Sequence, residues 1–158
     1  MAQKPAFDIS KLSTASKILL GAGLLLFIDM LLQWNQACAL GFCAGVSGWH
    51  GGLGVILGLL VLVLLIWEGL RVLNVKVAMG TMSPAMLSAI IAGAVTLFAI
   101  LRFLVKPSAG PVGVSRSFFA WIGLILGLVI GYGAYLAMQE AGTSPAAPPP
   151  ADTPGFTA

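Results

Sequence analysis

Residues 49–70 read WHGGLGVILGLLVLVLLIWEGL and form the most hydrophobic stretch of the chain. A helix rises about 1.5 Å per residue, so about 20 apolar residues cross a hydrocarbon core of about 30 Å. This run therefore predicts a membrane-spanning helix. The composition agrees, because 59% of the 158 residues are hydrophobic and 8% are charged, whereas about a quarter of a soluble domain is charged. The sequence predicts an integral membrane protein.

Outward from this stretch, three more apolar runs occupy residues 18–34, 85–104 and 118–138. The first is short and is interrupted by Asp29. The run at residues 85–104 follows Ser83 and Pro84, a typical helix start. None of the runs alternates polar and apolar residues as barrel strands do, so helices are expected throughout. The fold class predicted is an all-α membrane protein with four transmembrane helices in a compact bundle.

One transmembrane domain is expected at residues 18–141, after a polar segment at residues 1–17. Residues 142–158, GTSPAAPPPADTPGFTA, are rich in Pro and Ala and are expected to form a disordered tail. The first run also fits a cleaved signal peptide, because lysines precede it and the ACA at residues 37–39 resembles a cleavage site. Its length and Asp29 within its core favour a retained span.

Basic residues predict the orientation, because Lys and Arg collect on the cytoplasmic side of a membrane. No Lys or Arg lies between Gln33 and Gly48, so this segment is expected outside and both termini inside. The third connection, which would also lie outside, carries basic residues as well, so the rule supports this topology in part. The basic residues counted inside are Lys4, Lys11, Lys17, Arg71 and Lys76, and those outside are Arg102, Lys106 and Arg116.

Cys38 and Cys43 lie in the outward segment CALGFCAGVSGWHGG at residues 38–52. Disulfides persist outside the cytoplasm, so a structural disulfide closing a tight glycine-rich turn is the favoured interpretation. Two reduced thiols are the alternative. A thiol-disulfide relay has little support, because there is no Cys-x-x-Cys and no second pair. A metal site with His50 would have only three ligands at no recognised spacing.

Charged side chains within the apolar runs are candidates for function, because they are costly there unless they are paired or reach water. Asp29 and Arg102 are expected in the same leaflet, where they can pair. Glu68 and Arg71 are three residues apart, which favours a local ion pair at the headgroup boundary. None is expected at the bilayer midplane, where a proton-coupled transporter needs a carboxylate, so snorkelling or paired interfacial charges are the favoured interpretation.

Glycines repeat at a spacing of four in the last run, at Gly123, Gly127 and Gly131. Such spacing removes side chains from one helix face and lets another backbone approach closely. Gly54 and Gly58 repeat the spacing in the second run, and Ala85, Ala89 and Gly93 form a similar stripe in the third. These faces are expected to pack within the bundle or between copies of the chain. Tryptophans near the run ends are expected to anchor the helices at the membrane surface: Trp34, Trp49, Trp67 and Trp121.

The order of these segments resembles that of uncharacterised small four-span membrane proteins of actinobacterial type. The resemblance rests on FDISKLSTASKILLGAGLLLFIDMLLQW (7–34), the paired-cysteine segment, WEGLRVL (67–73) and FFAWIGLILGLVIGYGAYLAMQEAG (118–142). It covers residues 7–142 and implies a bacterial plasma membrane. It implies no activity, cofactor or catalytic residue.

No phosphate-binding loop, zinc helix or nucleophile elbow occurs, and the scattered basic residues make no nucleic-acid patch. The sequence therefore favours a non-enzymatic accessory or scaffolding protein of the cell envelope, with no cofactor or metal. Its expected partners are the lipid bilayer and other membrane proteins or copies of itself. The alternative is a small transporter or channel subunit that assembles through the glycine stripes, followed by an extracytoplasmic thiol oxidoreductase.

Overall fold

Helices make up most of the computed structural model, which describes residues 12–39, 41–73, 75, 82–105 and 114–143. In chain order, the elements are α1 (Thr14–Asp29), β1 (Gln33–Ala39), β2 (Phe42–Ser47), α2 (Gly52–Val72), α3 (Pro84–Leu104), β3 (Val114–Arg116) and α4 (Phe118–Thr143).

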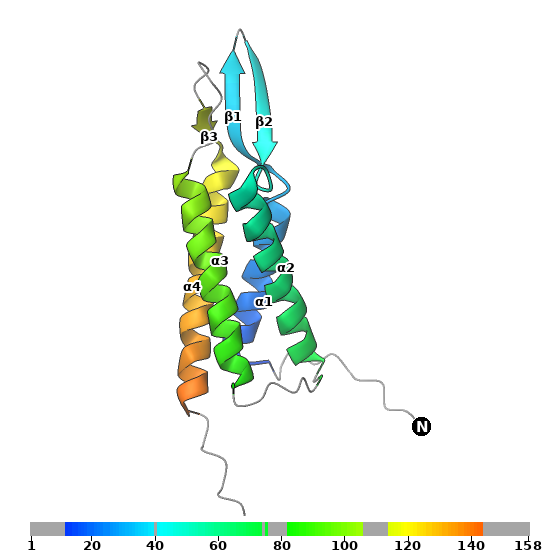
Figure 1. Cartoon of the computed structure of the whole chain (residues 1–158), viewed down its shortest axis with the longest axis vertical. Coiled ribbons are helices and arrows are strands. Elements are labelled where there is room, and N and C mark those ends of the chain that lie inside the picture. The colour runs from blue at the N-terminus through cyan, green and yellow to red at the C-terminus, as the bar shows by residue number, and fades with distance from the viewer. Residues whose placement is uncertain (1–11, 40, 74, 76–81, 106–113, 144–158) are drawn as a thin grey trace, which may run out of the picture.

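The four helices lie side by side and alternate in direction along the chain (Figure 1). Both α1 and α3 pack against α2 and α4, and the buried faces form a main hydrophobic cluster and a smaller one of Ala15, Ala89 and Ala137. The strands stand beyond one end of the bundle, which we call the sheet end (Figure 1). The beginning of α1 and the end of α4 both lie at the opposite end.

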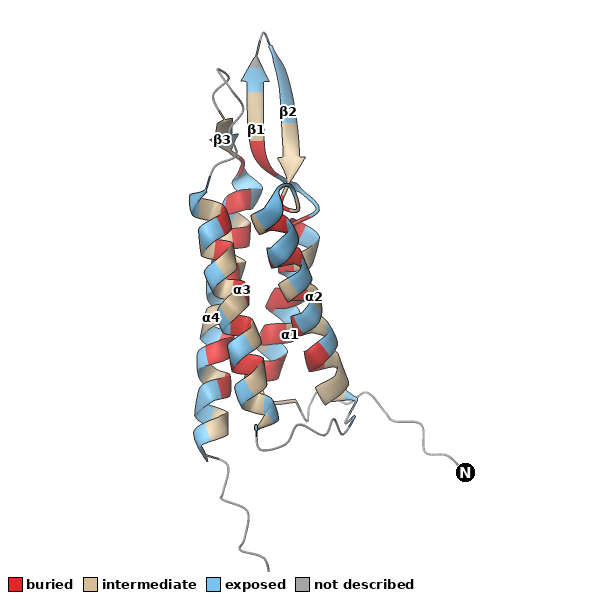
Figure 2. Ribbon diagram, in the orientation of Figure 1, coloured by how far each residue is buried: buried red, intermediate tan, exposed pale blue. Residues whose placement is uncertain are grey.

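Apolar side chains cover both the inside and the outside of the bundle. Buried residues line the faces that the helices turn toward one another, and exposed residues cover the outer faces (Figure 2). The centre is filled by Leu26, Leu57 and Ile130, none of which is exposed. Large apolar residues such as Ile66 and Ile125 are about 60% exposed on the outside. An apolar outer surface suits a lipid solvent, as expected of a membrane protein.

Among the described residues, three helices rather than the expected four are long and apolar enough to cross a membrane: α2 and α3 with 21 residues each, and α4. α1 has 16 residues and is about 24 Å long. It begins earlier than expected, because the Ser13 hydroxyl caps it by accepting from the Ser16 N–H at 3.2 Å. It also ends earlier, at Asp29, because the chain turns there and the Leu32 N–H bonds the Asp29 carbonyl at 3.0 Å. Residues 33–34, which were expected in the first span, lie in β1.

A small antiparallel sheet replaces the expected simple turn between the first two helices, so the prediction of helices throughout was wrong here. β1 and β2 form a hairpin in which Ala39 pairs with Phe42, and Gly41 takes the positive φ of 84° in the turn. β3, from the third connection, pairs with the other edge of β1, which gives the order β2-β1-β3. The sheet therefore ties the two connections of this end together.

The bounds of the three longer helices follow the apolar runs closely. The start of α3 is confirmed, because Pro84 is its first residue and the Ser83 hydroxyl accepts from the Met86 N–H at 3.2 Å. α2 begins at Gly52 and α4 begins at Phe118. The polar segment up to residue 11, the tail from residue 144 onward, and Lys76 and Lys106 lie outside the described residues.

Candidate functional site

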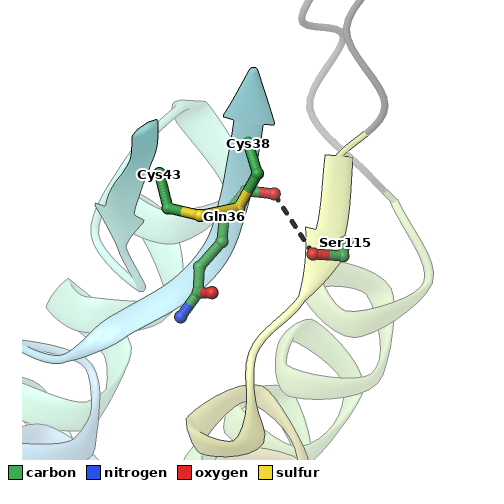
Figure 3. The surroundings of a disulfide bond; sticks show 4 residues. All are labelled: Gln36, Cys38, Cys43 and Ser115. Carbon is green, nitrogen blue, oxygen red and sulfur yellow. Dashed lines mark hydrogen bonds between the residues drawn. A yellow bond between two sulfur atoms is a disulfide. The ribbon is translucent and has the colours of Figure 1, made fainter. Parts of the chain in front are cut away.

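The disulfide lies at the sheet end, near the tip of the β1–β2 hairpin. Cys38 and Cys43 occupy directly opposed positions in the register and are bonded at an S–S distance of 2.04 Å (Figure 3). The disulfide interpretation is therefore confirmed over two reduced thiols. The bond takes up both thiols, so neither cysteine is a thiolate ligand for a metal in this state.

Hydrogen bonds hold the hairpin to the start of α4. The Ser115 hydroxyl in β3 donates to the Gln36 carbonyl in β1 at 3.4 Å (Figure 3). The Ser117 N–H donates to the Trp34 carbonyl at 3.0 Å, and its hydroxyl donates to the Gln33 carbonyl. The base of the hairpin is thereby fixed to the bundle.

The tip of the hairpin is open to its surroundings. The Phe42 side chain is 83% exposed, the highest value among the exposed large hydrophobic residues of the described chain. Cys43 and Ala44 beside it are also exposed. β2 is an outer strand of the sheet, so no strand of the described part of the chain lies beside its far edge. The tip thus offers an aromatic side chain together with a strand edge that no described strand covers.

Below the hairpin, Trp34 and Asp29 form a buried polar pair. The Trp34 Nε1–H donates to the Asp29 carboxylate at 2.9 Å and to the Asp29 carbonyl at 3.2 Å. Trp34 is 1% exposed, and its ring lies where Gly123 of α4 has no side chain. The Trp34 ring therefore points into the core of the bundle, and its expected place at the level of the membrane surface stays a prediction.

Arg102 lies at the same end, in the last turn of α3, and is 5% exposed. Its Nε donates to the Gly48 carbonyl at 3.4 Å, and its Nη2 has no hydrogen-bond partner among the described residues. The expected pairing with Asp29 is not formed within the described part of the chain. The Asp29 carboxylate faces Trp34 instead, and its Oδ1 is also buried without a partner there. The sheet end therefore holds two buried charges that do not neutralise each other.

At the opposite end, Glu68 and Arg71 of α2 form the expected ion pair at 3.0 Å. Glu68 is fully buried, and the Ser88 hydroxyl of α3 donates to its carboxylate. Ser88 also accepts from the Trp67 Nε1–H at 3.0 Å and from Arg71 at 2.8 Å. Sequence reasoning missed Ser88, a polar residue that lies one helical turn after Pro84 in the apolar run at residues 85–104. The cluster satisfies its own charges and joins α2 to α3.

The glycine series of α4 packs within the chain. An added Cβ would lie 2.2 Å from the Trp34 ring at Gly123, 2.7 Å from Ala99 at Gly127 and 3.0 Å from Thr96 at Gly131. Thr96 also donates to the Gly127 carbonyl at 3.0 Å, a bond that fixes α3 against α4.

The other small-residue stripes differ from one another. The Trp49 ring covers Gly58, and the Trp49 backbone crosses Gly54, so Trp49 packs on α2 rather than marking the membrane surface. Gly93 is exposed and a Cβ there would meet nothing within 4 Å, so the α3 stripe does not continue to it. Of the four tryptophans, Trp121 is the exposed one, at 51%.

Comparison with known protein families, with curated proteins and with solved structures finds no match to this chain.

Proposed function

We propose that this chain is a non-enzymatic accessory protein of a bacterial plasma membrane that holds its disulfide-closed hairpin outside the cytoplasm as a contact surface for another envelope protein. The observation that carries the proposal is the exposed Phe42 at the tip of a hairpin that is closed by a disulfide and fixed to the bundle. A rigid aromatic side chain loses little conformational entropy on contact with a partner, and aromatic residues are enriched at protein interfaces.

The disulfide supports the proposed orientation. Disulfides form and persist outside the cytoplasm, which favours a sheet end that faces outward and an opposite end that faces the cytoplasm. The start of α1 and the end of α4 share the opposite end, so the proposed orientation has both on the cytoplasmic side. Arg71, in the last turn of α2, then lies at the cytoplasmic surface.

The packing of the bundle supports an accessory role over a pore built from several copies. Gly123, Gly127 and Gly131 contact side chains of the same chain, so these positions are already occupied. A contact between copies through that stripe would need the bundle to open. The buried Glu68 is held by Arg71 and Ser88, an arrangement that fixes a charge rather than moving one.

Photocrosslinking in intact cells tests the proposal. A benzophenone amino acid replaces Phe42 at the tip in one variant, and Leu128 in the control. Leu128 is 52% exposed on the outer face of α4, which lipid surrounds in this topology. We expect discrete crosslinked protein bands from position 42 and none of the same size from position 128. No protein crosslink at position 42, or the same bands from both positions, would contradict the proposal.

A further inference from the structure

A cavity of about 240 Å³ opens at the sheet end between the start of α2 and the end of α3. It lies away from the hairpin tip, so it is independent of the proposed protein contact. One side is the backbone that enters α2, and the other is the last turn of α3. Its lining residues are His50, Gly51, Gly52, Leu53, Arg102 and Val105.

The start of α2 forms one wall of this cavity. The first N–H groups of a helix have no acceptor within the helix, and the aligned peptide dipoles make this end positive. Gly51 precedes α2 with a φ of 80° and has no side chain, so no side-chain cap accepts from these groups. The amides of Gly52 and Leu53, both in the cavity lining, are therefore suited to an anion.

Arg102 supplies a full positive charge to the same cavity. It is 5% exposed and lines the cavity, and its Nη2 has no partner among the described residues. None of the lining residues is acidic. A buried guanidinium without a counter-charge is costly, and its planar donors match the oxygens of a phosphate or carboxylate. Two independent features therefore favour an oxyanion at one place.

We propose that this cavity binds a phosphate group, which the Arg102 guanidinium and the amides at the start of α2 hold together. The His50 imidazole, also in the lining, can add one N–H donor. Anionic lipid headgroups and free phosphate share this chemistry. Leu53 and the exposed Val105 give the cavity an apolar part of its lining. That apolar part suits the acyl chains of a lipid whose headgroup occupies the site.

Lipid titration of the full chain in neutral detergent tests the proposal. The ligands are a short-chain phosphatidylglycerol, the diacylglycerol with the same chains but no phosphate, and inorganic phosphate at constant ionic strength. The readouts are the thermal unfolding midpoint and native mass spectrometry of the bound lipid. We expect saturable binding of one phosphatidylglycerol and a higher midpoint. A matching effect of inorganic phosphate identifies a site for the free anion, whereas no effect of it identifies the lipid headgroup.

Three variants link the binding to the cavity. Arg102→Gln removes the charge, and Gly52→Pro removes one amide donor at a position where proline suits the first turn and where nothing lies within 4 Å of an added Cβ. Each is expected to weaken phosphatidylglycerol binding about tenfold or more. Arg116→Gln is the control at the same end, because Arg116 bonds the Phe103 and Leu104 carbonyls outside the lining, and it should bind as the unchanged chain does.

Two results would overturn the proposal. One is an equal response to phosphatidylglycerol and diacylglycerol, because the phosphate would then contribute nothing. The other is unchanged affinity in Gly52→Pro, which tests the amide donors even where Arg102→Gln does not fold.

Discussion

At the scale of single residues, Trp34 organises the sheet end. Its backbone belongs to β1, its ring fills the space left by Gly123, and its Nε1–H satisfies one oxygen of the Asp29 carboxylate. A carboxylate in an apolar bundle is costly without such a donor. The end of α1, the beginning of the sheet and the packing of α4 therefore all depend on one side chain.

Trp34→Phe keeps most of the ring and removes the donor. Asp29 Oδ2 then loses its hydrogen bond, while Oδ1 is already buried without a partner among the described residues. We expect the free energy of unfolding in detergent to fall by about 1–3 kcal/mol, the usual cost of a buried group left unsatisfied. Trp121→Phe is the control, because Trp121 is 51% exposed and should change little. Equal losses in the two variants would show that the Trp34–Asp29 bond contributes nothing.

Gly123→Ala tests the close packing of the same site. The new Cβ would lie 2.2 Å from the Trp34 ring, so the ring or α4 has to move. We expect a loss of about 1–3 kcal/mol in stability, as overpacking costs elsewhere. Gly93→Ala, also a helical glycine, has nothing within 4 Å and should be neutral or slightly stabilising. Thermal unfolding of the two variants measures this difference, and equal unfolding midpoints would contradict the close packing at Gly123.

The tryptophans show why residue roles were harder to predict than helices. Trp at the end of an apolar run typically sits at the membrane surface, and Trp121 is exposed. Trp34 and Trp49 have the same sequence context, yet their rings turn inward because Gly123 and Gly58 leave space on the facing helices. Gly123 lies far away in sequence from Trp34, so the composition near Trp34 carries no sign of this space.

At the scale of elements, the long helices were predictable and the sheet was not. Twenty or more apolar residues in a row predict a helix by length alone, and α2, α3 and α4 follow their runs. The strands consist largely of small or polar residues such as Gln36, Ala37 and Ala44, with no alternation to reveal them. Their pairing comes from the disulfide register and from β3, which is remote in sequence. The early end of α1 was missed for the same reason, because residues 33–34 join the sheet.

Removing the disulfide tests how much the hairpin depends on it. The Cys38→Ser/Cys43→Ser double variant loses the small covalent ring that the disulfide closes. The loop-entropy relation gives a loss of about 2 kcal/mol in stability for such a ring. The helices are held by their own buried faces, so we expect the helical content to stay and the unfolding midpoint to fall. The unchanged chain under strong reductant should match the double variant. A double variant that is as stable as the oxidised chain would mean that the register holds without the bond.

Ser88→Ala tests the cluster that joins α2 to α3. The hydroxyl bonds Trp67, Glu68 and Arg71, so its loss leaves buried partners with one contact fewer. We expect a loss of about 1–3 kcal/mol in the free energy of unfolding. Ser115→Ala removes an exposed hydroxyl that makes one long bond to Gln36, and it should cost much less. Comparable losses in the two variants would show that apolar packing alone stabilises the contact between α2 and α3.

At the scale of the whole molecule, the two ends of the bundle differ in kind. The sheet end has a disulfide, an exposed aromatic tip and two buried charges that do not pair with each other. The opposite end has a closed ion-pair cluster. Both ends are joined by helices whose outer faces are apolar, so the molecule has two chemically distinct surfaces separated by a lipid-compatible belt. This difference between the two ends can serve a function only if the chain sits in the membrane in one orientation.

Single cysteines in a cysteine-free background measure that orientation. Phe42→Cys places a thiol at the hairpin tip, and Val75→Cys places one at the opposite end, where Val75 is 48% exposed just after α2. With a membrane-impermeant thiol reagent on intact cells, we expect labelling at position 42 and none at position 75 until the cells are opened. The reverse pattern would put the cysteines in a reducing compartment, where the native disulfide would not persist, and the hairpin would then face the cytoplasm. Labelling of both positions in intact cells would mean that the chain inserts in both orientations.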